Sequence, residues 1–244
     1  MFSQPGESFI FILRKTFHLN YLSHYYVDYP EDRPYYVLGL ILPDLVREIE
    51  PRKIRFSSEA LMLDSPQSEI ADHLNRGIMR HLEVDIIFHN SPYFHKGCQV
   101  IKDWLSRFTY KSIPNRIHIF AHVLLELMID RVLIEKDPEM MDRFYDNLEQ
   151  VEKQPLLDFF AHNGIIHRAD AVYERVRYFC KDRFLYRYPD NEMMLYALNV
   201  LNQKVGNSVI EAEDEERLLD TIALTEEWLR ADQLSIFGEL RNHG

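Results

Sequence analysis

Histidine and carboxylate side chains recur at a helical interval in the segment RGIMRHLEVDIIFHNSP, residues 76–92. Within it, His81, Asp85 and His89 follow one another at intervals of four residues. Residues four apart lie one above the other on the same face of a helix. Because imidazole nitrogens and carboxylate oxygens bind divalent ions, this face predicts a set of metal ligands.

The neighbouring residues indicate which way this face points. On a helical projection, Leu74, Ile78 and Leu82 fall beside His81 and Asp85, while the arginines gather on the other side. We therefore expect the face to point inward, which disfavours a purely solvated role. One alternative stays open: a buried His–Asp pair that orders the core through a hydrogen bond.

A second segment repeats the pattern in RIHIFAHVLLELMIDRVLI, residues 116–134. His118, His122, Glu126 and Asp130 again stand four apart, and nearly every residue between them is apolar. We predict that His122 and Glu126 form the closest pair, whereas Asp130 lies furthest round the helix. The alternative is that this polar stripe is the solvated side of an amphipathic helix.

Two further residues stand at the ends of predicted helices. These are His24 in YLSH and Asp44 in LPD, for which the alternatives are a histidine packed among tyrosines and a helix-capping aspartate. Facing helices with such side chains are how helical bundles hold metal ions. The predicted ligands are therefore His24, Asp44, His81, Asp85, His122 and Glu126, with His89, His118 and Asp130 as further candidates. A set without thiolates suits Mn, Fe, Mg or Zn in a hydrolytic or oxidative role.

Helices must position these residues, and the composition favours them. The chain contains only 8 glycines in 244 residues and shows neither a repeat nor a strand-hairpin pattern. Asn90 or Ser91 before Pro92, and Ser112 before Pro114, are predicted N-caps, and Gly206 is a predicted C-cap. We expect an all-α fold of eight or nine helices in one domain over residues 19–205. Residues 1–18 are a predicted extension, 50–68 a connection, and 206–244 a C-terminal helix packed on the domain.

The predicted helix bounds follow the same reasoning. A helix near residues 19–26 precedes one over 35–41 that ends near Pro43, and a long helix covers 69–89. Others follow to about residues 108 and 135, and the last covers about 212–231.

Charge and cysteine content exclude several classes of function. A net charge of −11 disfavours general binding to nucleic acid or anionic membranes. Cys98 and Cys180 stand in no C-x-x-C pattern, so a reducing cytoplasm is the expected location. The apolar run at residues 9–13 is too short for a signal peptide or a membrane span. No G-x-S-x-G segment and no glycine-rich phosphate loop occurs.

One basic segment offers a docking surface in this acidic chain. RADAVYERVRYFCKDRFLYRYP interleaves basic residues with tyrosines, and an acidic partner would contact Arg175, Arg177, Lys181 and Arg183. The alternative is that these residues pair with carboxylates of the chain itself.

Three ordered segments resemble a known family. LNYLSHYYV, VLGLILPDLVR and GIMRHLEVDIIFHNSP are similar in order and spacing to the opening of the acyl carrier protein phosphodiesterase family, helical relatives of HD-domain metal phosphohydrolases. The similarity covers about residues 19–95 and is carried by Asn20 to His24, by Gly39, Leu42 and Asp44, and by His81, Val84 and Asp85. FAHVLLE weakly resembles a later His-bearing helix of that family.

The resemblance implies an HD-like helical bundle that hydrolyses phosphodiesters with a divalent ion, Mn²⁺ before Mg²⁺, Fe²⁺ or Zn²⁺. Its substrate would be acyl carrier protein, from whose serine phosphopantetheine is released. As a hypothesis, Asp44 and Glu126 are the catalytic carboxylates, and Glu126 takes the proton of the attacking water.

The chain departs from the family at two places. Leu40 stands where the family has Asn, and His89-Asn90 replaces a Thr-Asp pair; a His-Asp dipeptide is also missing. Two alternatives therefore stay open: a non-catalytic metal-binding scaffold of the same fold, and a hydrolase of another phosphoester, such as a nucleotide or a phospholipid head group.

Overall fold

The computed structural model describes residues 20–49, 56, 68–113, 116–163 and 169–242. Within these ranges the chain forms eleven α-helices and one short 3-10 helix, and no strand. The all-α prediction is therefore confirmed for the described residues. The predicted extension 1–18 lies outside these ranges, as does the predicted connection 50–68 apart from residues 56 and 68.

The helices belong to two compact units. The α7 unit, named after helix α7 (Ile117–Lys136), contains the described residues of 1–23, 87–138 and 185–244. The α3 unit, named after helix α3 (Pro34–Ile49), contains those of 24–86 and 139–184. Two of the four boundaries fall within helices α2 (Tyr21–Asp28) and α5 (Glu69–Asn90). The last forty residues, predicted as an appended helix, belong to the α7 unit together with α6 and α7.

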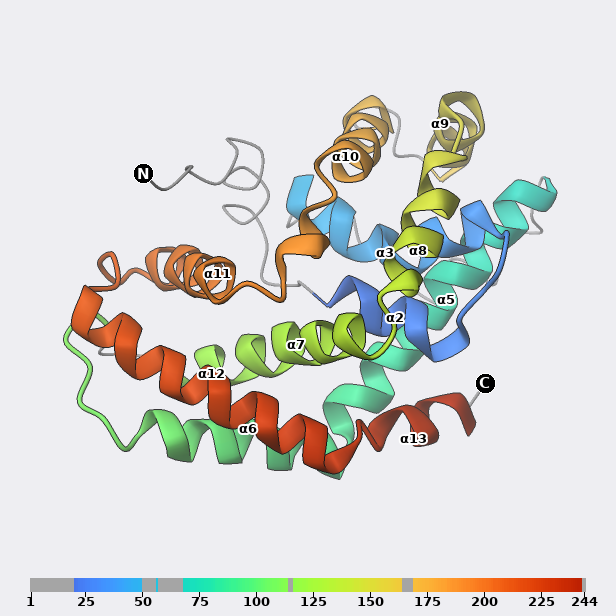
Figure 1. The fold of residues 1–244 in the computed structure, drawn as a ribbon. Coiled ribbons are helices and arrows are strands. Elements are labelled where there is room, and N and C mark those ends of the chain that lie inside the picture. Colours follow the sequence, from blue (N-terminus) through green and yellow to red (C-terminus); the bar gives the residue numbers. More distant parts are fainter. Residues whose placement is uncertain (1–19, 50–55, 57–67, 114–115, 164–168, 243–244) are drawn as a thin grey trace. The chain divides into compact units, whose positions relative to one another are not determined.

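The α7 unit is built around α7 (Ile117–Lys136). Helices α6 (Pro92–Leu105), α11 (Asn191–Lys204) and α12 (Ala212–Asp232) pack against it, and α13 (Ile236–Asn242) follows α12 (Figure 1). Every side chain of α7 from Phe120 to Ile134 is buried except that of His122. This burial includes Glu126 and Asp130, so the solvated-stripe interpretation of α7 is wrong for these two residues.

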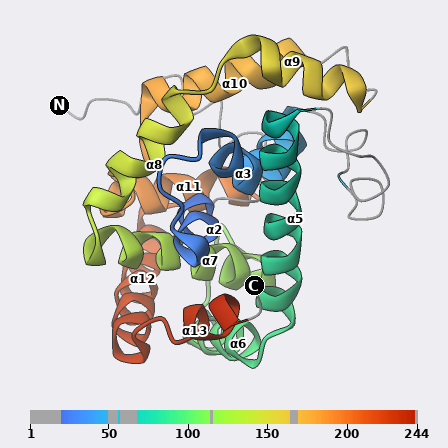
Figure 2. The same cartoon turned by 90° about the vertical axis from the view of Figure 1, so that its right-hand side faces the viewer.

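The α3 unit is built around α3 (Pro34–Ile49). It packs against α8 (Glu139–Glu149) and α10 (Ala169–Asp182), and α10 lies beside α9 (Lys153–His162), as Figure 2 shows. The greater part of α2 and of α5 belongs to this unit as well. These two helices and α3 carry four of the six principal ligand candidates.

Local signals predicted several helix ends. Ser91 caps α6, because its Oγ accepts a hydrogen bond from the N–H of Phe94, and Pro92 is the first helical residue. Gly206 follows the last turn of α11 with a φ of 91°, the left-handed conformation that glycine adopts without strain. The bounds of α5 and α12 agree with the predicted helices to within one residue.

Three expectations need correction. Helix α3 continues through Pro43 to Ile49, so Asp44 lies inside a helix and not at its end. Arg116, not Ser112, occupies the N-cap of α7, because Asp214 accepts the hydrogen bonds of the Ser112 N–H and Oγ. Among the described residues the helices number eleven and not eight or nine. One of the added helices is α13, which begins after the left-handed residues Gln233 and Leu234 interrupt the chain.

Candidate metal-binding site

The predicted ligands fall into two clusters, one in each unit. His24, Asp44 and His81 form the buried cluster in the α3 unit, and His89, His122 and Glu126 form the outer cluster in the α7 unit. Within each cluster, one potential ligand atom from every residue lies within 4.8 Å of the others. The described residues therefore contain two separate sets of imidazoles and carboxylates.

The orientation of His81 is fixed by a backbone carbonyl. Its Nδ1 lies 2.8 Å from the carbonyl oxygen of Leu40, which can only accept a hydrogen bond, so Nδ1 carries a proton. In the neutral ring, Nε2 then carries the lone pair, and it lies 3.8 Å from Oδ1 of Asp44. Metal-binding histidines are oriented in this way in proteins, with one nitrogen donating to a carbonyl and the other facing the ion.

His24 and Asp85 complete the surroundings of His81. The rings of His24 and His81 stack with centroids 4.1 Å apart and planes inclined by 27°. His24, Asp44 and His81 are at most 2% exposed. Asp85 lies at the edge, with its Oδ1 4.0 Å from Nε2 of His24 and 23% of its side chain exposed. Asp85 is therefore a partly exposed carboxylate beside this buried cluster.

Two glycines allow α3 and α5 to approach closely enough for the contact with Leu40. A Cβ added to Gly39 would lie 2.5 Å from the carbonyl oxygen of Leu74, and one added to Gly77 would lie 2.3 Å from that of Tyr36. Real Cβ atoms do not approach oxygen so closely, so only glycine fits at either position. The sequence signal for this crossing is a glycine in the interior of each helix, which the spacing of the histidines and carboxylates does not reveal.

At the C-terminal end of α2, hydrogen bonds of Asp28 join α2 to α3 and α5. Asp28 accepts hydrogen bonds from the hydroxyl of Tyr36 on α3 and from Nε of Arg80 on α5, the latter at 3.1 Å. Burial, and secondly the Asp28 carboxylate, raise the pKa of Tyr36, which keeps its hydroxyl a donor. The helices that carry His24, Asp44 and His81 are thus held together by groups that bind no metal.

In the buried cluster, Nε2 of His81 faces the carboxylate of Asp44. A lone pair on His81 Nε2 faces a carboxylate oxygen, and Nε2 has no hydrogen-bond partner among the described residues. Two acceptors that face each other in a buried site repel each other, which costs free energy. Either a second proton on His81 or a divalent ion relieves this repulsion. The buried His–carboxylate alternative corresponds to the proton, and the metal site to the ion.

In the outer cluster the ligand atoms lie closer together. Nε2 of His122 is 2.9 Å from Oε1 of Glu126, and Nε2 of His89 is 3.2 Å from both of these atoms. His122 and Glu126 are one turn apart on α7, so their predicted pairing is confirmed. His89, ranked below them from the sequence, is the third member of the same cluster.

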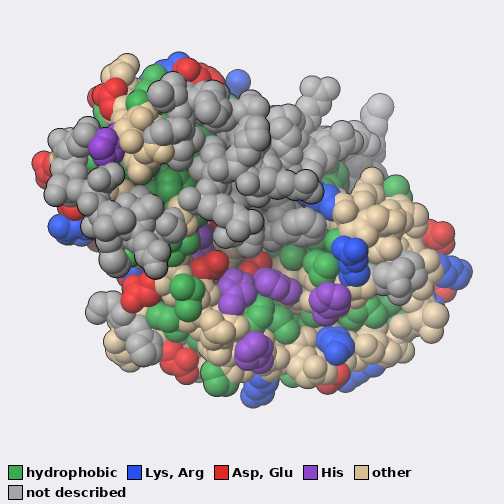
Figure 3. All heavy atoms as spheres, turned by 180° about the vertical axis from the view of Figure 1, so that it is seen from behind, with side chains coloured by type: hydrophobic (Ala, Val, Ile, Leu, Met, Phe, Trp, Pro, Cys, Tyr) green, Lys and Arg blue, Asp and Glu red, His purple; other side chains and the backbone are tan. Residues whose placement is uncertain are grey.

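Aromatic residues enclose the imidazoles of the outer cluster. The ring of Phe94 lies 4.8 Å from that of His89 and 4.9 Å from that of His122, measured between centroids. Ser91 stabilises the turn between α5 and α6, because its Oγ also donates a hydrogen bond to the carbonyl oxygen of Phe88 at 2.7 Å. The side chains of His89 and His122 remain 25% and 37% exposed, and Figure 3 shows histidine side chains gathered on one face of the protein.

Asp130 and His118 belong to neither cluster. Asp130 is fully buried, and its carboxylate accepts hydrogen bonds from the N–H groups of Leu22 and Ser23 and from the Ser23 hydroxyl. It therefore stabilises the first turn of α2, as an N-cap does. Burial, with a smaller contribution from Glu126, raises the pKa of Asp130 to about 7 despite these bonds. His118 is exposed on the first turn of α7.

The basic segment, which comprises α10 and the residues after it, is only partly engaged within the α3 unit. Arg183 pairs with Glu149 at 2.8 Å and lies within 4.0 Å of Asp142 and Asp146. Arg175 is buried. Pairing with carboxylates of the chain itself, the alternative to docking, therefore describes Arg183, while Arg177 and Lys181 are exposed.

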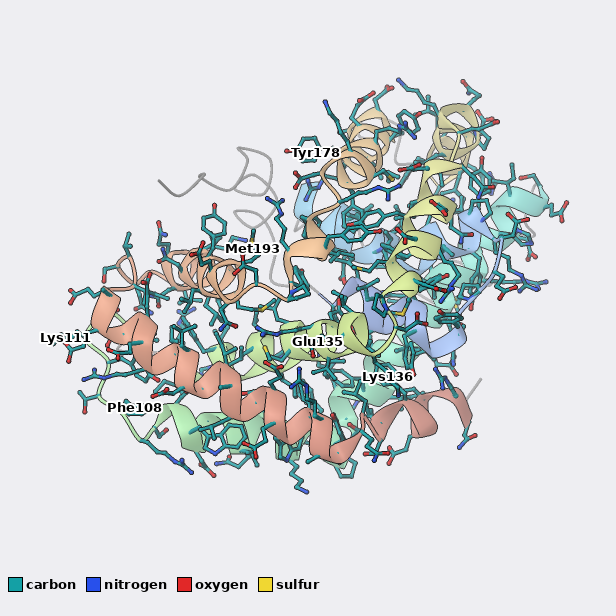
Figure 4. The ribbon with its side chains drawn as sticks, viewed as in Figure 1. Phe108, Lys111, Glu135, Lys136, Tyr178 and Met193 are labelled. Carbon is teal, nitrogen blue, oxygen red and sulfur yellow. The ribbon has the colours of Figure 1, made fainter. Side chains whose placement is uncertain are left out.

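The α7 unit also contains a surface pocket at the C-terminal end of α7. It has a volume of about 440 Å³ and is lined by Glu135 and Lys136, labelled in Figure 4, together with residues near the end of α12. Glu135 pairs with Arg230 of α12 at 2.5 Å across it. None of the residues of the outer cluster lines this pocket, and Glu135 is the ninth residue after Glu126, about 13 Å further along the helix axis.

Comparisons with known proteins supply no relative. No family model, no curated protein and no solved structure matches this chain. Among the described residues, none of the helices has the length and apolar character needed to cross a membrane.

Proposed function

We propose that this chain is a metal-dependent phosphodiester hydrolase that acts through the buried cluster. One observation carries the proposal: the Leu40 carbonyl holds the Nδ1–H of His81, so that its Nε2 faces Asp44. The segments that resemble the acyl carrier protein phosphodiesterase family contain His24, Asp44, His81 and Asp85. An HD-like arrangement of the helices and a preference for Mn²⁺ are part of this proposal.

The residues present fit a divalent ion. Two imidazoles and the carboxylate of Asp44 supply the donor set, and Nε2 of His81 lies 3.8 Å from Oδ1 of Asp44. A divalent ion bound there supplies Lewis-acid stabilisation of the negative charge on a phosphoryl group. The Leu residue at position 40 does not weaken this fit, because the contact with His81 uses the backbone carbonyl, which any residue offers.

The protein's own groups have separate roles in this proposal. His81, His24 and Asp44 are held by packing and keep the ligand atoms in place. Asp85 is the most exposed of these groups and, in place of Glu126, accepts the proton of the attacking water. Glu126 is engaged with His122 and His89 in the other unit.

For the substrate, we retain the phosphopantetheine–serine diester of acyl carrier protein. Arg177 and Lys181, which are exposed on α10, are the residues of the basic segment best placed to meet an acidic carrier. A second candidate is a non-catalytic metal-binding scaffold, and the near-complete burial of His24, Asp44 and His81 favours it, because closed sites are typical of structural metals.

Hydrolysis of bis-p-nitrophenyl phosphate by the full-length protein with Mn²⁺ tests the proposal. We expect turnover that EDTA abolishes, and a decrease of about 100-fold or more in kcat/KM for His81→Ala and Asp44→Asn, equivalent to about 3 kcal/mol. His73→Ala is the matched control, because His73 lies two turns before His81 on α5 and outside the cluster. It should retain full activity.

Two results would reject the proposal that the chain hydrolyses phosphodiesters through the buried cluster. The first is that the wild type binds Mn²⁺, that His81→Ala binds one equivalent less, and that the wild type cleaves no phosphodiester. The protein would then be a non-catalytic metal-binding scaffold. If activity persists in His81→Ala and Asp44→Asn at the wild-type level, the catalytic site is not the buried cluster.

A further inference from the structure

The three ligand atoms of the outer cluster form a small triangle with sides of 2.9, 3.2 and 3.2 Å. Zinc binds nitrogen and oxygen ligands at about 2.0–2.1 Å, so adjacent ligands are about 3.3 Å apart in a tetrahedron and about 2.9 Å apart at right angles. The triangle formed by His89, His122 and Glu126 therefore has the dimensions of one face of such a coordination sphere.

Hydrogen bonds alone do not satisfy all three sides of this triangle. His89 Nε2 and His122 Nε2 each carry at most one proton, and the ionised Glu126 carries none. If both imidazoles donate to Glu126, two N–H groups confront each other at 3.2 Å. If one imidazole donates to the other, one of the two nitrogen–carboxylate sides is left without a proton. A cation at the centre of the triangle satisfies all three sides together.

The surroundings leave one side of the triangle open. Glu126 is buried at its base, whereas the two imidazoles are partly exposed and packed against Phe94. The thiol of Cys98, on the neighbouring helix α6, does not belong to the group of ligand atoms formed by His89, His122 and Glu126. Three protein ligands with solvent access are the arrangement of sites that keep a position for water or substrate.

We infer that His89, His122 and Glu126 bind a zinc-type divalent ion with at least one coordination position open to solvent. Two imidazoles and one carboxylate favour Zn²⁺ and its late transition-metal neighbours over Mg²⁺ or Ca²⁺, which prefer oxygen ligands. The inference does not rest on the proposed function, because the site shares no residue with the buried cluster and lies in the other unit.

Cobalt substitution in the full-length protein tests this site. After EDTA treatment and removal of the chelator, Co²⁺ is titrated and its visible absorption recorded, followed by competition with Zn²⁺. We expect absorption in the wild type that Zn²⁺ displaces. His89→Ala, His122→Ala and Glu126→Gln should each weaken Co²⁺ binding by at least about 100-fold, because each removes a ligand.

Two control variants distinguish this site from scattered surface imidazoles and from the buried cluster. His95→Ala removes an exposed imidazole of the same unit from α6, and His81→Ala removes a ligand of the buried cluster. Both should keep the Co²⁺ absorption of the outer cluster. Glu126→Gln preserves side-chain shape, and far-UV circular dichroism establishes that each variant is folded.

Three results would overturn the inference. Unchanged Co²⁺ absorption in His122→Ala and Glu126→Gln would exclude the cluster as the ligand set. An equal loss in His95→Ala would show binding dispersed over surface imidazoles. A loss confined to His81→Ala would place the ion in the buried cluster. The last result would leave the hydrolase proposal standing, so the two proposals fail separately.

Discussion

The buried and outer clusters use the same side chains in opposite surroundings. In the buried cluster, His24, Asp44 and His81 are at most 2% exposed. Nε2 of His81 lies 3.8 Å from Oδ1 of Asp44, and Nε2 of His24 lies 4.0 Å from Oδ1 of Asp85. In the outer cluster, the imidazoles of His89 and His122 are 25% and 37% exposed, and the distances among the ligand atoms of these residues and Glu126 are 2.9 to 3.2 Å. The buried cluster therefore has the wider spacing between ligand atoms, and the partly exposed outer cluster has the closer spacing.

This difference indicates what determines the spacing of the ligand atoms in each cluster. The buried ligands project from helices whose separation is fixed by backbone contact at Gly39 and Gly77, so they cannot easily move together. Distances of 3.8 and 4.0 Å exceed the 3.3 Å or so of a zinc tetrahedron. They do not match the spacing of zinc ligands, whereas the distances in the outer cluster do.

The largest expected effect comes from Gly39→Ala. The added methyl group would lie 2.5 Å from the carbonyl oxygen of Leu74 and force α3 away from α5. We expect unfolding free energy to fall by about 3 kcal/mol. Thermal denaturation should show a decrease in Tm of about 6–12 °C for a chain of this size.

Gly238→Ala is the matched control for this prediction. Gly238 lies in α13 with nothing within 4 Å of an added Cβ, so alanine should be neutral or slightly stabilising there. A Gly39→Ala protein with the wild-type Tm would show that α3 and α5 do not cross at backbone contact.

The second effect is ion-selective stabilisation. We expect Mn²⁺ at a hundredfold excess over its Kd to stabilise the metal-free protein by about 2.7 kcal/mol through the buried cluster, and Zn²⁺ to act through the outer one. The Mn²⁺ shift in Tm should disappear in His81→Ala and persist in His122→Ala, and the Zn²⁺ shift should do the reverse. If one variant abolishes both shifts, the two clusters are not independent sites.

The third effect is a pH dependence that originates beside the outer cluster. The pKa of Asp130 is about 7 in the folded protein, above its ordinary value of 3.8. The folded state therefore binds the proton more tightly, and the stabilising contribution is complete below pH 4 and is lost as pH rises through 7. We therefore expect the free energy of unfolding to decline as the pH rises across that range.

Urea denaturation between pH 4 and pH 8 measures this dependence. In Asp130→Asn, which does not titrate, the decline should be absent, so the difference between wild type and variant narrows with rising pH. Zn²⁺ should reduce the wild-type decline, because neutralising Glu126 removes one cause of the raised pKa. Parallel pH profiles for wild type and Asp130→Asn would exclude this origin.

The sequence predicted the features that depend on local spacing. The pairing of His122 with Glu126 and the cap at Ser91 involve residues at most four apart, and both are present. The inward orientation of His81 followed from its apolar neighbours on α5 and is confirmed by its burial. Helical periodicity and capping chemistry determine such features within one segment.

Features that depend on long-range packing were not predicted. Pro43 was expected to end a helix, but tertiary contacts carry α3 past it, which places Asp44 in the helix interior. Asp130 was ranked as a metal ligand, and its role as the acceptor for the N–H groups of Leu22 and Ser23 joins positions more than a hundred residues apart. The association of His89 with α7 is also a contact between distant segments, which spacing alone does not encode.

The smallest effect should be that of His122→Ala on the metal-free protein. The His122 side chain is 37% exposed, so its removal leaves no closed cavity and should cost less than about 1 kcal/mol. His81→Ala instead leaves a buried void beside Asp44 and should cost about 2 kcal/mol or more. Urea denaturation in EDTA compares the two variants. An equal cost for both would mean that exposure does not separate the clusters, and the outer site would then be as much a part of the folded core as the buried one.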